Sequence, residues 1–98
     1  MKLNNIAIFT DDNLTNNEKL VLLDLITIVG NDFSLPIRET NDEIAKHCSL
    51  TGRSVATMIK NLKDKNYIKV EYRGVFRKIF ISCWNNFNLW YNGTRFRR

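Results

Sequence analysis

The fold is decided by residues 40–82, which read TNDEIAKHCSLTGRSVATMIKNLKDKNYIKVEYRGVFRKIFIS. Thr40 and Glu43 have the spacing of a capping box, which predicts the start of a helix about two turns long. Residues 48–50 form a tight connection, and Thr51 is the predicted N-cap of a longer helix. The stretch therefore opens with two consecutive helices joined by a short turn.

The longer helix is predicted to run to about Lys65, with Asn66 as its stop. Its inward stripe has helical spacing and consists of Val55, Met58, Ile59 and Leu62. From Tyr67 the periodicity changes to two, with apolar side chains alternating with charged ones. This change predicts a β-hairpin over residues 67–82 that turns at or near Arg73-Gly74. The register stays open, because Arg-Gly is not a preferred two-residue turn.

Another helix is predicted upstream of this stretch. It is the first of three along the chain, so the helix capped by Thr51 is the third. Thr15 and Glu18 form a capping box that starts it, and Gly30 ends it. Its apolar side chains cover nearly the whole circumference, so we expect it to be covered on more than one side. Residues 4–9 are a candidate short strand. Residues 33–38 are predicted to be extended, as an edge strand or a loop, because they contain a proline.

The C-terminal segment, residues 83–98, is predicted to be helical at first, since its apolar residues recur at helical spacing. Two compatible interpretations are open: packing on the first helix, or a dimer interface with an equivalent segment. The candidate interface residues are Trp84, Phe87, Trp90 and Tyr91. The basic tail at residues 95–98 either contacts phosphates or is disordered.

The charge of the chain is divided unevenly. Residues 1–50 carry four Lys and Arg against eight Asp and Glu, a net charge of −4. Residues 51–98 carry eleven against two, a net charge of +9, although the whole chain has only +5. Such an excess on one segment indicates an anionic partner.

Several classes of protein are excluded by composition. The chain has no apolar run long enough for a membrane span and no signal peptide at its start, so a cytoplasmic location is expected. Cys48 and Cys83 form no close-spaced motif, and His47 has no partner at metal-ligand spacing. No catalytic constellation can be assembled. We therefore expect a single domain over residues 1–98 that is not an enzyme and has no metal, cofactor or small-molecule ligand.

The order of these elements resembles the winged helix-turn-helix family. The resemblance covers residues 15–82, with the helix-turn-helix at 40–65 and the wing at 67–82. It implies an α+β fold with a three-helix core and a two-stranded β-wing, and it implies DNA binding by the third helix and the wing. The chain departs from the commonest pattern at Cys48-Ser49, where a glycine-containing pair is usual.

The predicted contacts of the third helix lie opposite its apolar stripe. Arg53 suits a guanine edge, the Thr57 methyl suits a thymine methyl, and Lys60 suits a phosphate. The Thr51 cap and the first amides of the helix are candidates for a second phosphate. Asp64 shares this face and would repel the DNA backbone.

The wing offers a larger set of candidate contacts. Three cations and two aromatic side chains surround a glycine turn, and such a tip suits a minor groove. The residues are Tyr72, Arg73, Gly74, Phe76, Arg77 and Lys78. We predict that the wing contributes at least as much to binding as the third helix.

The sequence thus predicts a protein that binds double-stranded DNA with sequence preference, as a homodimer. Richness in Asn, Ile and Lys fits a bacterial mobile element. One predicted role is an accessory factor for plasmid replication, partition or conjugative transfer that recruits a protein partner at its site. The alternatives are a transcription regulator, a winged-helix module for protein interaction, and an RNA-binding module.

Overall fold

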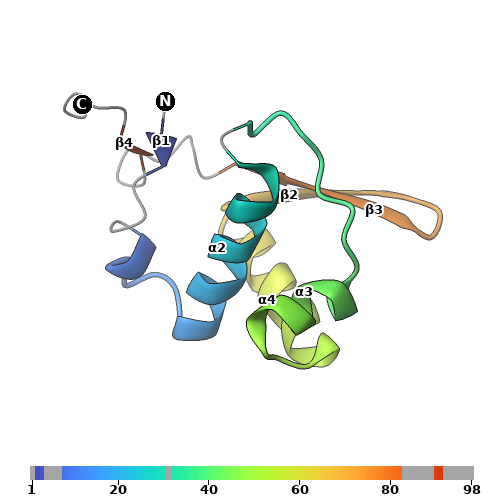
Figure 1. Ribbon diagram of the computed structural model, residues 1–98, viewed down its shortest axis with the longest axis horizontal. Coiled ribbons are helices and arrows are strands. Elements are labelled where there is room, and N and C mark those ends of the chain that lie inside the picture. The colour runs from blue at the N-terminus through green and yellow to red at the C-terminus, as the bar shows by residue number, and fades with distance from the viewer. Residues whose placement is uncertain (1, 4–7, 31, 83–89, 92–98) are drawn as a thin grey trace.

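The computed structural model describes residues 2–3, 8–30, 32–82 and 90–91, and side chains within 8–30 and 32–82. This part of the chain has the α+β architecture expected, with three helices and an antiparallel hairpin (Figure 1). The elements are β1 (Lys2–Leu3), α2 (Asn16–Val29), α3 (Asn41–Cys48), α4 (Gly52–Asp64), β2 (Ile68–Arg73), β3 (Phe76–Ile81) and β4 (Trp90–Tyr91). Their order and pairing are consistent with a winged-helix layout.

All three helices begin at the predicted threonine caps. The hydroxyls of Thr15 and Thr40 each accept a hydrogen bond from the amide of the glutamate three residues on, at 3.2 Å. Each glutamate accepts in return from the amide of its threonine, so both capping boxes are complete. Thr51 caps α4 by accepting from the Ser54 amide at 3.1 Å. Local sequence therefore sets where each helix starts.

The turn between α3 and α4 contains Ser49, at the position where the resemblance to winged helix-turn-helix proteins leads us to expect a glycine-containing pair. Ser49 has φ 55° and ψ 42°, which is the left-handed helical region. A side chain in this region costs about 1–2 kcal/mol. The Leu50 amide donates to the Ala45 carbonyl at 3.0 Å across the turn. The turn between these two helices is therefore formed without glycine.

α2 crosses the middle of the view in Figure 1 and packs against both α3 and α4, while α4 contacts the hairpin. Its Val21, Leu22 and Leu25 are fully buried and lie on one side of the helix, whereas Leu20 on the opposite side is 42% exposed, so cover on more than one side stays a prediction. Ile37 pairs with Ile79 by two backbone hydrogen bonds of 2.8 and 2.9 Å. The predicted extended segment thus adds one bridge beside β3, while residues 33–34 form a turn.

A buried ion pair joins the start of α2 to the end of α4. The Glu18 carboxylate is only 2% exposed and accepts from Lys65 Nζ at 2.6 Å and from Asn61 Nδ2 at 2.9 Å. Lys65 Nζ also donates to the Asn13 carbonyl at 2.6 Å. Burial raises the pKa of Glu18, but these donors and the Thr15 amide outweigh burial and leave that pKa below its ordinary value. The pair fixes the orientation of α4.

The hairpin register is settled by the pairing of Arg73 with Phe76, which leaves Gly74 and Val75 as a two-residue loop. Gly74 has φ +61° and Val75 does not have a positive φ. A glycine with positive φ at the first loop position is the pattern of a type II′ turn. The hairpin and its turning point were thus predicted correctly, and the structure adds the register.

Two predictions about the ends of the chain are wrong where they can be compared. Residues 8–9 are helical rather than part of a strand, with Ile8 fully buried in the core. Trp90–Tyr91 is a strand paired with Lys2–Leu3, not part of a helix. Aromatic side chains favour extended backbone, and a partner strand outweighs helical spacing. The rest of the predicted strand, and Trp84 and Phe87, lie outside the described residues.

Candidate nucleic-acid interface

The exposed face of α4 carries the side chains that the sequence assigned to it. Arg53, Thr57 and Lys60 are exposed on the side opposite the buried Val55 and Ile59. The Thr57 hydroxyl donates to the Arg53 carbonyl at 3.2 Å, which leaves its methyl group available for an apolar contact. Arg53 makes no ion pair with any residue of the described part of the chain. Its guanidinium is therefore free to bind a ligand.

Lys60 has a partner on its own helix. Its Nζ lies 2.8 Å from Asp64 Oδ2, and both side chains are largely exposed. This hydrogen bond raises the pKa of Lys60 and lowers that of Asp64. A phosphate at Lys60 would have to share or displace this carboxylate, so Asp64 limits the cationic character of α4.

A second carboxylate stands at the N-terminus of α4. The Asp42 carboxylate lies against Gly52, so close that a Cβ at this position would collide with it. A negative charge is favourable at a helix N-terminus. The Thr51 cap is exposed, but a phosphate placed here would meet Asp42. Sequence reasoning missed this contact because the two residues belong to different helices.

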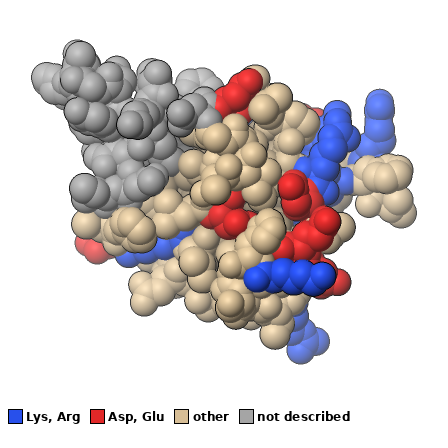
Figure 2. All heavy atoms as spheres, in the orientation of Figure 1, with Lys and Arg blue, Asp and Glu red and all other residues tan. Residues whose placement is uncertain are grey.

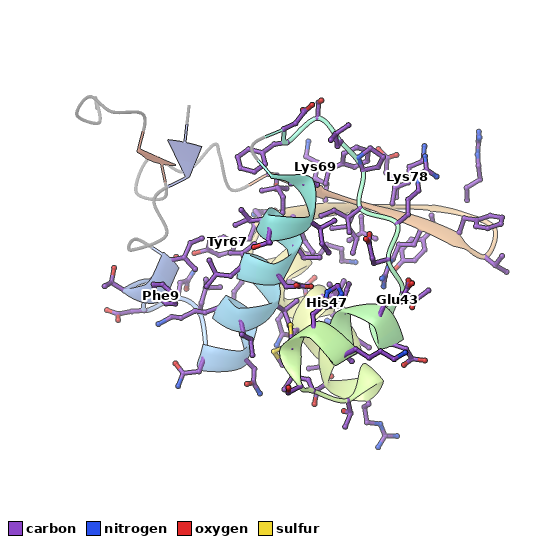
Figure 3. All side chains as sticks on the ribbon, viewed as in Figure 1. Phe9, Glu43, His47, Tyr67, Lys69 and Lys78 are labelled. Atoms are coloured by element: carbon purple, nitrogen blue, oxygen red, sulfur yellow. The ribbon has the colours of Figure 1, made fainter. Side chains whose placement is uncertain are left out.

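The hairpin presents different residues on its two faces. Directly opposed residues of an antiparallel pair share a face. Tyr72 therefore shares the core-facing side with Arg77, as Val70 does with Ile79. The second face holds the remaining candidates, together with Lys69 and with Glu71, which is directly opposite Lys78, and is turned away from the core (Figure 3). Its candidates are Arg73, Phe76 and Lys78. The predicted cluster is thus divided between the two faces.

Arg77 has a structural partner that the sequence did not indicate. Its Nη1 donates to Asn41 Oδ1 at 2.7 Å and its Nη2 donates to the Glu39 carbonyl at 2.9 Å. Both acceptors are neutral, so no carboxylate offsets the positive charge of the guanidinium. Arg77 thereby ties β3 to the segment that leads into α3.

A groove of about 290 Å³ lies between α4 and the core-facing side of the hairpin. Its walls bring together three cations and a tyrosine from elements far apart in the sequence. The polar and aromatic lining residues are Asn41, Lys60, Lys63, Tyr72 and Arg77. The described residues that line this groove include no carboxylate. The groove therefore offers an anionic ligand a set of cations on two walls.

The acidic residues gather beside this region rather than in it. In the view of Figure 2, carboxylates cluster over the start of α3, next to the Lys and Arg of the hairpin. Glu43 stands at that helix start (Figure 3), where it completes the capping box. Carboxylates at helix starts are accounted for by capping and by the helix dipole.

The single histidine makes a contact between helices. His47 Nδ1 lies 3.0 Å from Asp24 Oδ2, which links α3 to α2. The hydrogen bond to Asp24 raises the pKa of His47. Among the described residues, no three His, Cys, Asp or Glu side chains are grouped so that they could hold a metal ion. No helix of this part of the chain is both long enough and apolar enough to cross a membrane.

Of the residues predicted at a dimer interface, Trp90 and Tyr91 are placed in β4, and nothing is described of their side chains. Comparison of the chain with protein-family models, curated proteins and solved structures finds no match.

Proposed function

We propose that this chain is a winged helix-turn-helix domain that binds double-stranded DNA with sequence preference, with α4 as the recognition helix and the hairpin as the wing. The observation that carries the proposal is the groove between them, which has three cations on its walls and no carboxylate. Neutralisation of phosphates by Lys and Arg supplies most of the affinity of such proteins for DNA.

The residues have distinct roles in this proposal. Arg53, free of ion pairs and near the start of α4, contacts a base edge, and Thr57 contacts a thymine methyl beside it. Lys60 and Lys63 contact phosphates along the groove. On the outer face of the hairpin, Arg73 and its neighbour Lys78 contact the backbone or the minor groove. Because Asp64 pairs with Lys60 and Asp42 stands at the α4 start, the hairpin carries the larger share of binding.

The test is fluorescence anisotropy on duplexes selected from a random pool, at several salt concentrations. Arg53→Ala is expected to weaken binding and relax sequence preference at one base pair, while Arg73→Ala weakens binding and lowers the salt slope by about 0.9. Lys46→Ala is the matched control, since Lys46 is an exposed cation of α3 outside the groove. Absence of salt-dependent binding, or equal effects of all three variants, would overturn the proposal.

The competing classes are separated by the same assay. Single-stranded RNA that competes better than the selected duplex would indicate an RNA-binding module, and no nucleic-acid binding would leave a protein-interaction module. An accessory factor of a mobile element and a transcription regulator both require the duplex contact. The position of selected sites, at an origin-like repeat or at a promoter, distinguishes these two roles.

A homodimer remains part of the proposal. The β1–β4 pair lies at the end of the molecule opposite the hairpin tip (Figure 1). Two copies joined near that pair would leave both grooves open to DNA. Selected sites with two half-sites about 34–36 Å apart, one helical turn, would support this arrangement.

A further inference from the structure

The tip of the hairpin exposes an unusual amount of apolar surface. Val75 is 93% exposed, Phe76 71% and Tyr72 70%. Val75 occupies a loop position where a polar residue would serve the turn equally well, and no core contact requires its side chain. Clustered exposed apolar side chains mark a binding surface.

Cations flank this apolar apex on both faces of the hairpin. Arg73 pairs with Phe76 on the outer face, and Arg77 pairs with Tyr72 on the inner face. Each face therefore holds one guanidinium and one aromatic ring at directly opposed positions, about 5 Å apart at Cβ. Residues 72–78 contain three cations and no carboxylate, while Glu71 is opposite Lys78 on the outer face and Glu39 lines the hollow beside the tip. An anionic partner with apolar surface between its charges would complement this tip.

Duplex DNA is the occupant that the structure favours. Tyr72 and Arg77 line both the hollow at the tip and the groove beside α4, so the two surfaces are continuous. DNA bound in the groove therefore reaches the tip. The minor groove is about 6 Å wide and the two strands of a hairpin are about 4.8 Å apart, so a hairpin cannot lie flat in it. Only the loop can enter, with Val75 foremost.

We infer that Val75 and Phe76 insert between two base pairs from the minor groove and bend the duplex. Apolar wedges of this kind unstack a base step and kink DNA by 20–90°. The Arg73 guanidinium, which makes no ion pair in the described residues, holds the wedge by contacting a phosphate beside it, while Arg77 stays bound to Asn41 and the Glu39 carbonyl. Pyrimidine–purine steps unstack most readily, so a TA or CA step is expected where the tip meets the site. This inference rests on the proposed DNA binding.

The test is the energy transfer between dyes at the two ends of a duplex that carries the selected site, with binding followed by anisotropy in the same sample. The wild-type complex is expected to shorten the end-to-end distance, as a bend of at least 20° requires. The Val75→Ser/Phe76→Ser variant is expected to bind the site more weakly and, at protein concentrations at which anisotropy shows the site to be saturated, to leave it straight. Leu35→Ser is the matched control, because Leu35 is an exposed apolar residue outside the tip. It should bend DNA like the wild type.

The outcomes separate the inference from the proposal beneath it. A wild-type complex that binds but does not bend the duplex, or a tip variant that bends it fully, overturns the wedge and leaves DNA binding intact. Absence of wild-type binding overturns both. Tip-dependent binding to vesicles of equal phosphatidylserine and phosphatidylcholine, with an unbent duplex, would overturn the wedge in favour of a lipid surface.

Discussion

Lys65→Met is expected to destabilise the protein more than any other substitution of an exposed or half-exposed lysine in the described chain. It keeps the apolar stem of the side chain but removes the charge that faces the Glu18 carboxylate, which is 2% exposed. Breaking a fully buried ion pair costs about 3–5 kcal/mol. Because the Lys65 side chain is 31% exposed, solvent screening reduces this to about 2 kcal/mol.

The second bond of Lys65, to the Asn13 carbonyl, adds about 1 kcal/mol. The total is about 3 kcal/mol of unfolding free energy, or a midpoint roughly 12–24 °C lower for a domain of this size. Urea unfolding at pH 7, followed by far-ultraviolet circular dichroism, measures the change. Lys63→Met is the control, because Lys63 is exposed on the same helix and has no ion pair in the described residues. It should change stability by less than about 0.5 kcal/mol.

The same pair predicts a dependence on pH. The pKa of Glu18 is lowered in the folded state, so its stabilising contribution is present above its ordinary value of 4.5 and is lost as the pH falls through the folded value. The difference between the wild type and Lys65→Met should therefore shrink as the pH falls below about 4.5. A Lys65→Met cost no larger than that of Lys63→Met, or one that is constant between pH 7 and 3, would refute the reasoning.

Three further outcomes are expected. Asp64→Asn removes the carboxylate that competes with phosphate for Lys60, so binding to random duplex should tighten by up to about fivefold, the worth of an exposed ion pair; an unchanged affinity would contradict this role. His47→Gln should flatten the pH dependence of stability. The raised pKa of His47 stabilises the fold below the ordinary value of 6.5, and this contribution is lost as the pH rises through the folded value. Thermal melts from pH 5 to 9 measure the effect, and a wild type whose stability does not fall over this range would argue against the Asp24 contact. Gly74→Ala should cost about 1–2 kcal/mol in urea unfolding through its positive φ alone, since a Cβ there meets no atom within 4 Å; a smaller cost would mean that the turn relaxes.

Features that depend on neighbouring residues could be predicted from the sequence. The caps Thr15, Thr40 and Thr51 each act on an amide three residues away, and the structure has all three bonds. The end of α4 is similar, since Asn66 adopts φ 68° directly after the C-cap residue Lys65. The hairpin follows from its alternation and a glycine turn. These signals are local, so three to six residues suffice to detect them.

Contacts across the fold could not be predicted in this way. Lys65 lies 47 positions from Glu18, and Arg77 lies 36 positions from Asn41. Nothing in the pattern of charges distinguishes these two cations from Arg53, which is free. Only the packing of α2 against α4, and of β3 against the α3 start, brings the acceptors within reach. Charge alone therefore overestimated how many cations are available for a ligand.

The C-terminal prediction shows a different limit. Apolar spacing around Trp90 fits a helix, but the structure has Trp90–Tyr91 paired with Lys2–Leu3 at the other end of the chain. The spacing of apolar residues shows only which of them would share a face if the segment were a helix. It does not report whether a distant segment offers an unpaired backbone edge.

The buried part of the hairpin ends well before the turn, which affects how the sequence of the tip can diverge in evolution. The residues from 71 to 76 are all exposed, whereas the base of the hairpin is held by Ile68, Ile79 and Ile81 in the core. Substitutions at the tip therefore leave the folding energy nearly untouched, Gly74 excepted. Under the proposed DNA binding, site preference can diverge by variation at a few tip positions without compensating changes elsewhere, and a library randomised there should yield mostly folded members.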